Sequence, residues 1–129
     1  MLNFTNKKIG EVITKTDIAE DDICNIIVSS FEGGSNYWMG LNNEGEEWEQ
    51  KPKDEPLSTW ATKLLLDGKS ITLIDIEEDK EHIVNLKDIL KGIQLNNQNR
   101  KWASDKENWD ATDADCIIQY SIFNDVIYG

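Results

Sequence analysis

The fold is decided by the stretch SITLIDIEEDKEHIVNL, residues 70–86, in which two runs of strand-forming residues flank a polar tetrapeptide. Residues 70–76 and 81–86 are rich in isoleucine, leucine, valine and threonine, and residues 77–80 read Glu-Glu-Asp-Lys. Two such runs separated by a short polar segment are typical of a β-hairpin. We therefore predict an antiparallel hairpin over residues 70–86.

Helical patterns lie on both sides of this hairpin. Apolar residues recur at near-helical spacing between Asp17 and Phe31, where Thr16 and Asp17 offer N-cap oxygens and Gly33-Gly34 can end the helix. The same periodicity predicts three further helices, over residues 59–66, 86–95 and 113–123. Their expected N-caps are Ser58, Asn85 and the pair Thr112 and Asp115.

Mixed helices and strands without strict alternation favour the α+β class. Further strands are predicted over residues 35–41 and 126–129, with a polar loop over residues 42–55. We expect a small antiparallel sheet of three to four strands packed with three to four helices, as a single domain over residues 16–129. Residues 1–15 are predicted to form an N-terminal strand or extended arm through Ile9, Val12 and Ile13, packed on the body or on another copy in a homo-oligomer.

The composition restricts the partners of the chain. It has 129 residues and a formal charge of −12, with 25 acidic and 13 basic residues, and its only arginine is Arg100. Direct binding to nucleic acid is therefore not expected, because arginine forks usually read phosphates and guanines. The first eight residues lack a signal-peptide pattern and no apolar run approaches the ~20 residues of a membrane span, so we expect a cytoplasmic protein without membrane contact.

No catalytic centre, metal site or cofactor is predicted. Cys24 and Cys116 lie in apolar helical patterns and read as buried hydrophobic residues. His82, the only histidine, could pair with one of these cysteines only if the fold brought them together. Three aspartates cluster in sequence but lack the glycine and distal glutamate of a calcium loop, and are interpreted as acids at a helix start: Asp110, Asp113 and Asp115.

Two segments contain candidate binding residues. The acidic loop between Asn42 and Glu55 could bind a basic partner, with a tryptophan that either anchors the interface or folds back onto the core. The predicted partner-binding residues are Glu44, Glu46, Glu47, Trp48 and Glu49. A second segment could form a ligand pocket in which aromatic rings stack on a base, although its sequence favours a helix end followed by a core strand. Its residues are Glu32, Gly33, Gly34, Tyr37 and Trp38.

Three motifs carry a resemblance to a known family. The segments Phe31–Trp38, Asp113–Tyr120 and Asp125–Gly129 read FEGGSNYW, DADCIIQY and DVIYG. In order and in motif, residues 18–129 resemble a family of small proteins of uncharacterised function from phages and prophages of low-GC Gram-positive bacteria. The resemblance implies no activity and no catalytic residues. It implies an accessory phage gene, for which opposing host defence is a common role, although the acidic loop departs from the family pattern.

Three functions are compatible with these observations. The leading hypothesis is a phage-encoded, non-enzymatic inhibitor of a host defence protein, comparable in role to an anti-CRISPR protein, which binds a basic, nucleic-acid-binding protein surface in the host cytosol. One alternative is a nucleotide-binding sponge that sequesters a host immune signal, with Tyr37 and Trp38 stacking on the base. The other is a phage accessory protein of unrelated role. An enzyme has the least support.

Overall fold

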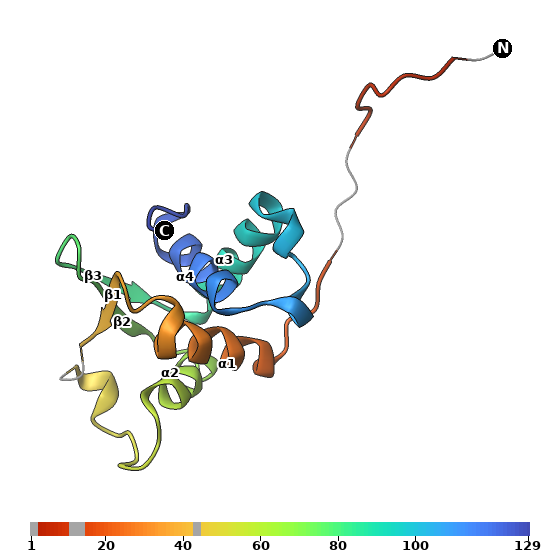
Figure 1. Ribbon diagram of the computed structural model, residues 1–129. Helices are drawn as coiled ribbons and strands as arrows, with labels where there is room; N and C mark the ends of the chain where they lie inside the picture. Colours follow the sequence, from red (N-terminus) through yellow and green to blue (C-terminus); the bar gives the residue numbers. More distant parts are fainter. Residues whose placement is uncertain (1–2, 11–14, 43–44) are drawn as a thin grey trace.

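The computed structural model describes residues 3–10, 15–42 and 45–129, and within them four α-helices pack against a three-stranded antiparallel sheet (Figure 1). The main elements are α1 (Glu20–Ser29), β1 (Met39–Leu41), α2 (Leu57–Leu66), β2 (Ile71–Asp75), β3 (Lys80–Val84), α3 (Leu86–Asn99) and α4 (Ala111–Phe123). Shorter helical turns are η1 (Ser30–Gly34), η2 (Glu46–Trp48), η3 (Lys101–Ala103) and η4 (Lys106–Asn108). The predicted α+β class is confirmed.

The predicted hairpin is present as β2 and β3. The two strands pair antiparallel from Ile71 opposite Val84 to Asp75 opposite Lys80, and a four-residue turn joins them. Asp79 in this turn has a φ of 54°, a left-handed conformation that aspartate tolerates better than most residues. β1 pairs with the other side of β2, so the sheet order is β1-β2-β3.

The core lies between the inner face of the sheet and the helices. Along β2 the residues Ile71, Leu73 and Asp75 are buried, which is the alternation expected of a strand with one covered face. Helix residues that are almost completely buried complete this core: Ile26, Ile27, Leu65, Ile89, Ile117 and Ile118. The apolar periodicity read from the sequence therefore corresponds to the helix faces that pack inward.

Only one of the predicted N-caps is found. Asn85 caps α3, since its side chain accepts a hydrogen bond from the backbone N–H of Asp88 at 3.0 Å. α4 begins two residues earlier than predicted, and Asp110 caps it by accepting from the backbone N–H of Asp113. Thr112 and Asp115, the expected capping pair, both lie inside this helix.

The first two helices also begin differently from the prediction. Ala19 precedes α1 without a side-chain cap of its own, and the side chain of Asp22 accepts from the Ala19 backbone N–H instead. α2 follows Pro56, and Ser58 is a buried residue of its first turn. Proline suits a helix start because the N–H that it lacks has no intrahelical partner there.

Two predicted strands differ in the structure. β1 is limited to three residues, because the backbone N–H groups of Trp38 and Met39 both bond to the carbonyl of Ser35 in a turn. Residues 126–129 form no strand. The Gln119 side chain accepts their backbone hydrogen bonds, those of Ile127 and Tyr128, in place of a neighbouring strand.

The described part of the N-terminal segment forms neither helix nor strand. Residues 3–10 are all exposed, and Figure 1 shows them clear of the helices and the sheet. Ile9 is almost fully exposed, whereas Val12 and Ile13 lie outside the described residues. None of the helices in the described ranges is long and apolar enough to cross a membrane.

Gly92 permits the close contact between α3 and α4. A Cβ atom at this position would lie 2.1 Å from the Ser121 Oγ and 2.5 Å from the Ile117 carbonyl oxygen of α4. The Ser121 hydroxyl already donates to that carbonyl at 2.7 Å, so the contact holds backbone as well as a side chain. The glycine in the middle of α3 is therefore a packing requirement.

We predict that Gly92→Ala destabilises the protein, although alanine normally favours a helix over glycine by about 1 kcal/mol. The added methyl group overpacks the α3–α4 contact, which costs about 1–3 kcal/mol. Urea denaturation followed by circular dichroism measures the change. Lys91→Ala, at the exposed neighbouring position, is the control and should stay within about 0.5 kcal/mol of the wild type. Equal stability of G92A and the wild type would contradict this packing role.

Candidate functional site

The buried carboxylate of Asp115, in α4, bonds to residues of the two sequence motifs FEGGSNYW and DADCIIQY. The Asp115 side chain is only 5% exposed and accepts four hydrogen bonds. Its Oδ1 accepts from the Ser35 hydroxyl at 2.8 Å and the Trp38 indole N–H at 2.7 Å. Its Oδ2 accepts from the Tyr37 hydroxyl at 2.6 Å and the Gln119 amide at 3.1 Å. All four donors are neutral, so hydrogen bonds rather than an ion pair stabilise this charge.

The Tyr37 hydroxyl is held as a donor by this environment. Its burial, and the hydrogen bond and charge of Asp115, raise the pKa of Tyr37 to about 12. Burial disfavours the charged phenolate, and the Asp115 carboxylate favours the phenol as a donor and repels a second negative charge. The phenol therefore stays protonated at neutral pH and ties the turn before β1 to α4, even though its ring is half exposed.

Gln119 extends the network to the C-terminal residues. Its side-chain oxygen accepts from the backbone N–H groups of Ile127 and Tyr128, at 2.9 and 2.8 Å. Its amide nitrogen donates to the Tyr128 carbonyl at 3.1 Å as well as to Asp115. A fully buried glutamine thereby satisfies backbone groups that would otherwise need a strand partner.

Tyr128 connects this network to a second buried carboxylate, Asp75. The Tyr128 ring stacks on Trp38 with centroids 5.4 Å apart, and its hydroxyl donates to the Asp75 carboxylate at 2.7 Å. The backbone N–H groups of Glu77 and Glu78 donate to the same carboxylate. The hydrogen bond to Asp75, with desolvation, raises the pKa of Tyr128 to about 12. The C-terminus is thus fastened to the start of the hairpin turn.

The hydroxyl and carboxylate groups of this network are buried or partly buried and link distant parts of the chain. Ser30, Ser35 and Asp115 form a hydrogen-bonded chain, but both serines are fully buried and no substrate can reach their hydroxyls. The His82 ring packs edge-on against Phe123 at 5.2 Å, and its buried Nε2 has no hydrogen-bond partner among the described residues. Those residues also contain no group of three histidine, cysteine or acidic side chains placed to hold a metal ion.

Two residues of the sequence-predicted ligand pocket, Trp38 and Gly34, are packed against other parts of the protein. Trp38 is 1% exposed and its ring contacts both Phe123 and Tyr128, so it is unavailable for stacking on a base. Gly34 packs against α4, since a Cβ there would lie 2.5 Å from the Ala111 carbonyl oxygen. Gly33 and Glu32 are exposed, and the Glu32 carboxylate accepts from the Ser58 hydroxyl at 3.4 Å. The segment is a helix end packed on α4, the other interpretation of its sequence.

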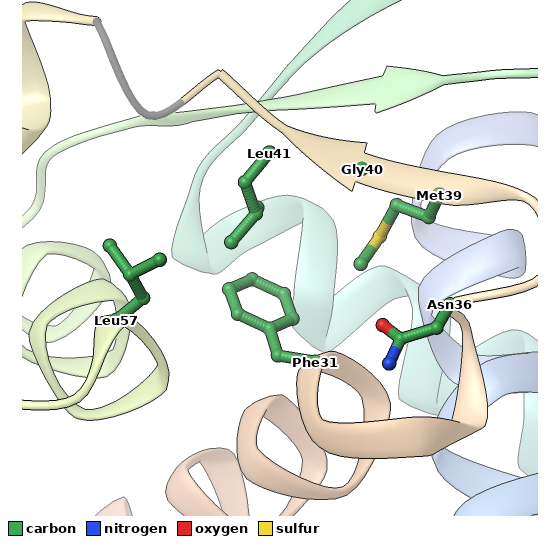
Figure 2. A pocket seen from close by; sticks show the side chains of 6 residues that line it. All are labelled: Phe31, Asn36, Met39, Gly40, Leu41 and Leu57. Carbon is green, nitrogen blue, oxygen red and sulfur yellow. The ribbon is translucent and has the colours of Figure 1, made fainter.

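A small cavity lies nearby, between β1, η1 and the start of α2. It has a volume of about 220 Å³, and Figure 2 shows Phe31 and Leu57 facing the strand across it. Its lining consists of Phe31, Asn36, Met39, Gly40, Leu41 and Leu57. Asn36 is the sole polar side chain of this lining, so the cavity offers no cation for a nucleotide phosphate.

The acidic loop contributes less free charge than the sequence suggests. Trp48 is 6% exposed and belongs to the core, so it does not present a surface anchor. The Glu47 carboxylate accepts from the Thr72 backbone N–H at 3.1 Å, and its carbonyl accepts from the Trp60 indole. Glu46 and Glu49 are exposed, while Glu44 lies outside the described residues. Replacing Trp48 or Glu47 would therefore perturb the fold as well as the surface.

The hairpin turn is an acidic surface that the sequence analysis did not select. Four of its acidic residues are exposed: Glu77, Glu78, Asp79 and Glu81. Two isoleucines beside them are also exposed, Ile76 at 53% and Ile83 at 74%. The exposure of Ile83 could have been predicted from the sequence, because neighbouring residues of a strand point to opposite faces and Val84 faces the core. Charge and apolar area thus occur together here.

Comparisons of this chain with protein-family models, curated proteins and solved structures found no match. The class of protein follows from the described residues: a small α+β protein with a structural polar network inside and an acidic surface. Its exposed groups are suited to binding another molecule by charge and apolar contact.

We predict that Asp115→Ala destabilises the protein by about 3 kcal/mol or more, because several buried donors lose their acceptor and each costs about 1–3 kcal/mol. Asp115→Asn should also destabilise, since its amide group would face other donors. Guanidinium denaturation measures both changes, and Asp54→Ala, at an exposed loop aspartate, is the control. A loss below 1 kcal/mol for D115A would show that the network does not hold the fold together.

We predict that the protein loses stability as the pH rises from about 10 towards about 12. Tyr37 and Tyr128 have folded-state pKa values of about 12, above the usual tyrosine value of 10.0. Each therefore contributes stability that is fully present below pH 10 and is lost as the pH rises through the folded pKa. Urea unfolding across this range measures the loss. The double variant Tyr37→Phe/Tyr128→Phe should show a smaller dependence on pH, and an unchanged slope would exclude these residues as the cause.

Proposed function

We propose that this protein is a non-enzymatic inhibitor that covers a basic, nucleic-acid-binding surface of another protein. The observation that supports this proposal best is the surplus of exposed carboxylates over available cations. The formal charge is −12, and acidic side chains are exposed on η2, on the hairpin turn and at the start of α1. Such a surface attracts basic partners and speeds their association.

Several of the cations are already engaged within the protein. Arg100 donates to Asp113 at 3.1 Å and to Asn96 at 2.8 Å. Lys106 pairs with Asp22 at 2.8 Å. Because these pairs remove positive charge from the outer surface, the electrostatic field that a partner meets is more uniformly negative than the composition suggests.

The resemblance to small phage proteins suggests a host defence protein as the target. Many such proteins hold nucleic acid in a groove lined by lysine and arginine, and a folded acidic protein can compete for that groove. The inhibitor would then act in the host cytosol, without a cofactor and without touching nucleic acid itself. Competition with nucleic acid is the property that defines this proposal.

The test begins with capture of binding proteins from a bacterial host lysate at low salt, followed by their identification. We predict that the protein displaces a labelled DNA or RNA duplex from a captured protein, measured by fluorescence anisotropy. The inhibition constant should rise about tenfold or more with increasing salt, because attraction between exposed charges is screened. A protein of similar size and neutral charge is the control.

A captured protein that binds this chain and its nucleic acid at the same time would contradict the proposal. Binding that is independent of salt would contradict the electrostatic mechanism in particular. In either case the surface charge would serve solubility, which is its most general role.

A further inference from the structure

The outer face of the sheet carries exposed and partly exposed isoleucines beside Thr72 and Glu81. Ile74 on β2 lies opposite Gly40 of β1 on one side and opposite Glu81 of β3 on the other. Ile83 lies opposite Thr72, is 74% exposed and stands on this same face by the alternation of the strands. The Ile76 side chain lies over the glycine of β1, where a Cβ atom would be 3.3 Å from its methyl carbon. The buried residues of β2 point to the opposite side, towards the helices.

The outer edge of β3 carries backbone groups that face away from the sheet. Within the described chain β3 pairs only with β2. The hydrogen bond from the Ile76 N–H to the Trp38 carbonyl shows that even-numbered residues of β2 bond towards β1. Odd-numbered residues therefore bond to β3, which turns the N–H and C=O groups of Glu81 and Ile83 outward. Such an edge can accept a further strand.

Negative charge is concentrated at one end of this edge. Residues 77–81 contain four acidic side chains and one lysine, a net charge of −3. The turn is held in place, because Asp75 accepts hydrogen bonds from the backbone N–H groups of Glu77 and Glu78. The carboxylates of these two glutamates are therefore available to a partner without rearrangement of the turn.

We propose that the edge of β3, together with Ile74, Ile76 and Ile83, is the docking surface for an extended segment of the partner that has apolar residues at alternate positions and basic residues at the end that lies beside the acidic turn. This inference rests on the proposed function and specifies its partner. The segment would add as a fourth strand and bond to Glu81 and Ile83. Its apolar side chains would cover the outer isoleucines, and its lysines or arginines would lie beside the acidic turn.

Other surfaces of the protein combine fewer of these properties. η2 has exposed glutamates, but its tryptophan is buried and Glu47 is bonded to Thr72. The cavity beside β1 is apolar and lacks an acidic lining. Only the β3 edge joins exposed apolar area, outward backbone groups and negative charge among the described residues, which is the combination that an extended basic segment requires.

A synthetic peptide of alternating lysine and leucine is the probe, and a peptide of alternating lysine and serine is its control for charge alone. Anisotropy of the labelled peptides measures binding. The leucine peptide should bind about tenfold tighter or more than the serine peptide, because only it can cover the isoleucines. Ile83→Ser and Ile83→Pro should each remove most of this difference, since proline takes away an outward N–H that an added strand would use.

Matched variants test whether the effect belongs to this surface. Leu90→Ser removes an exposed apolar side chain from α3, and Glu46→Gln/Glu49→Gln neutralises two exposed acids of the loop. Leu90→Ser should bind the leucine peptide and the captured partner like the wild type, and the Glu46/Glu49 variant should weaken both about twofold at most, through the loss of long-range attraction alone. Glu77→Gln/Glu78→Gln, with the same change in charge, should weaken both about tenfold. Circular dichroism and thermal unfolding confirm that each variant is folded.

The outcomes separate this inference from the proposed function. If the Ile83 and Glu77/Glu78 variants bind the captured partner like the wild type while the Glu46/Glu49 variant does not, the β3 surface is wrong and the inhibitor proposal stands. If no captured partner loses nucleic acid, the inhibitor proposal fails whatever the peptides do. A dimer of this chain that Ile83→Pro abolishes in sedimentation would assign the edge to a second copy and overturn the inference.

Discussion

The carboxylate of Asp115 belongs to α4, yet three of its four donors come from the turn that precedes β1, nearly eighty residues earlier in the chain. Burying a charge without a counterion costs several kcal/mol, and it is tolerated only where hydrogen bonds satisfy the oxygens. Here three donors tie the turn to α4, and the fourth, Gln119 of α4, also bonds to the C-terminal residues. The turn, the last helix and, through Gln119, the C-terminal residues therefore form one cooperative unit.

Features that depend on neighbours in sequence could be predicted, and those that depend on distant contacts could not. The hairpin and the Asn85 cap follow from residues within a few positions of each other. Asp115 has the spacing of a capping residue, and only the fold shows that its partners are Ser35, Tyr37 and Trp38. Trp48 lies in a polar segment but is buried in the core, and its neighbour Glu47 bonds to Trp60 of α2 and Thr72 of β2, contacts that sequence periodicity does not place.

The acidic residues in and beside the hairpin have two different roles. Asp75 is buried and orders the hairpin turn from within, whereas Glu77, Glu78 and Glu81 point their charge to solvent. The acidic side chains of this protein therefore fall into two groups. Some carboxylates are hydrogen-bond acceptors of the core, and the others set the electrostatic field that an approaching molecule meets.

The contacts of Tyr128 also bear on how the chain folds. Tyr128 stacks on Trp38, and its hydroxyl bonds to Asp75, which lies 53 positions earlier in the sequence. A contact between residues far apart in sequence requires the closure of a long loop, and proteins with many such contacts fold more slowly than proteins with mostly local contacts. The hairpin can therefore form from neighbouring residues, whereas the docking of Tyr128 has to wait until distant parts of the chain have come together.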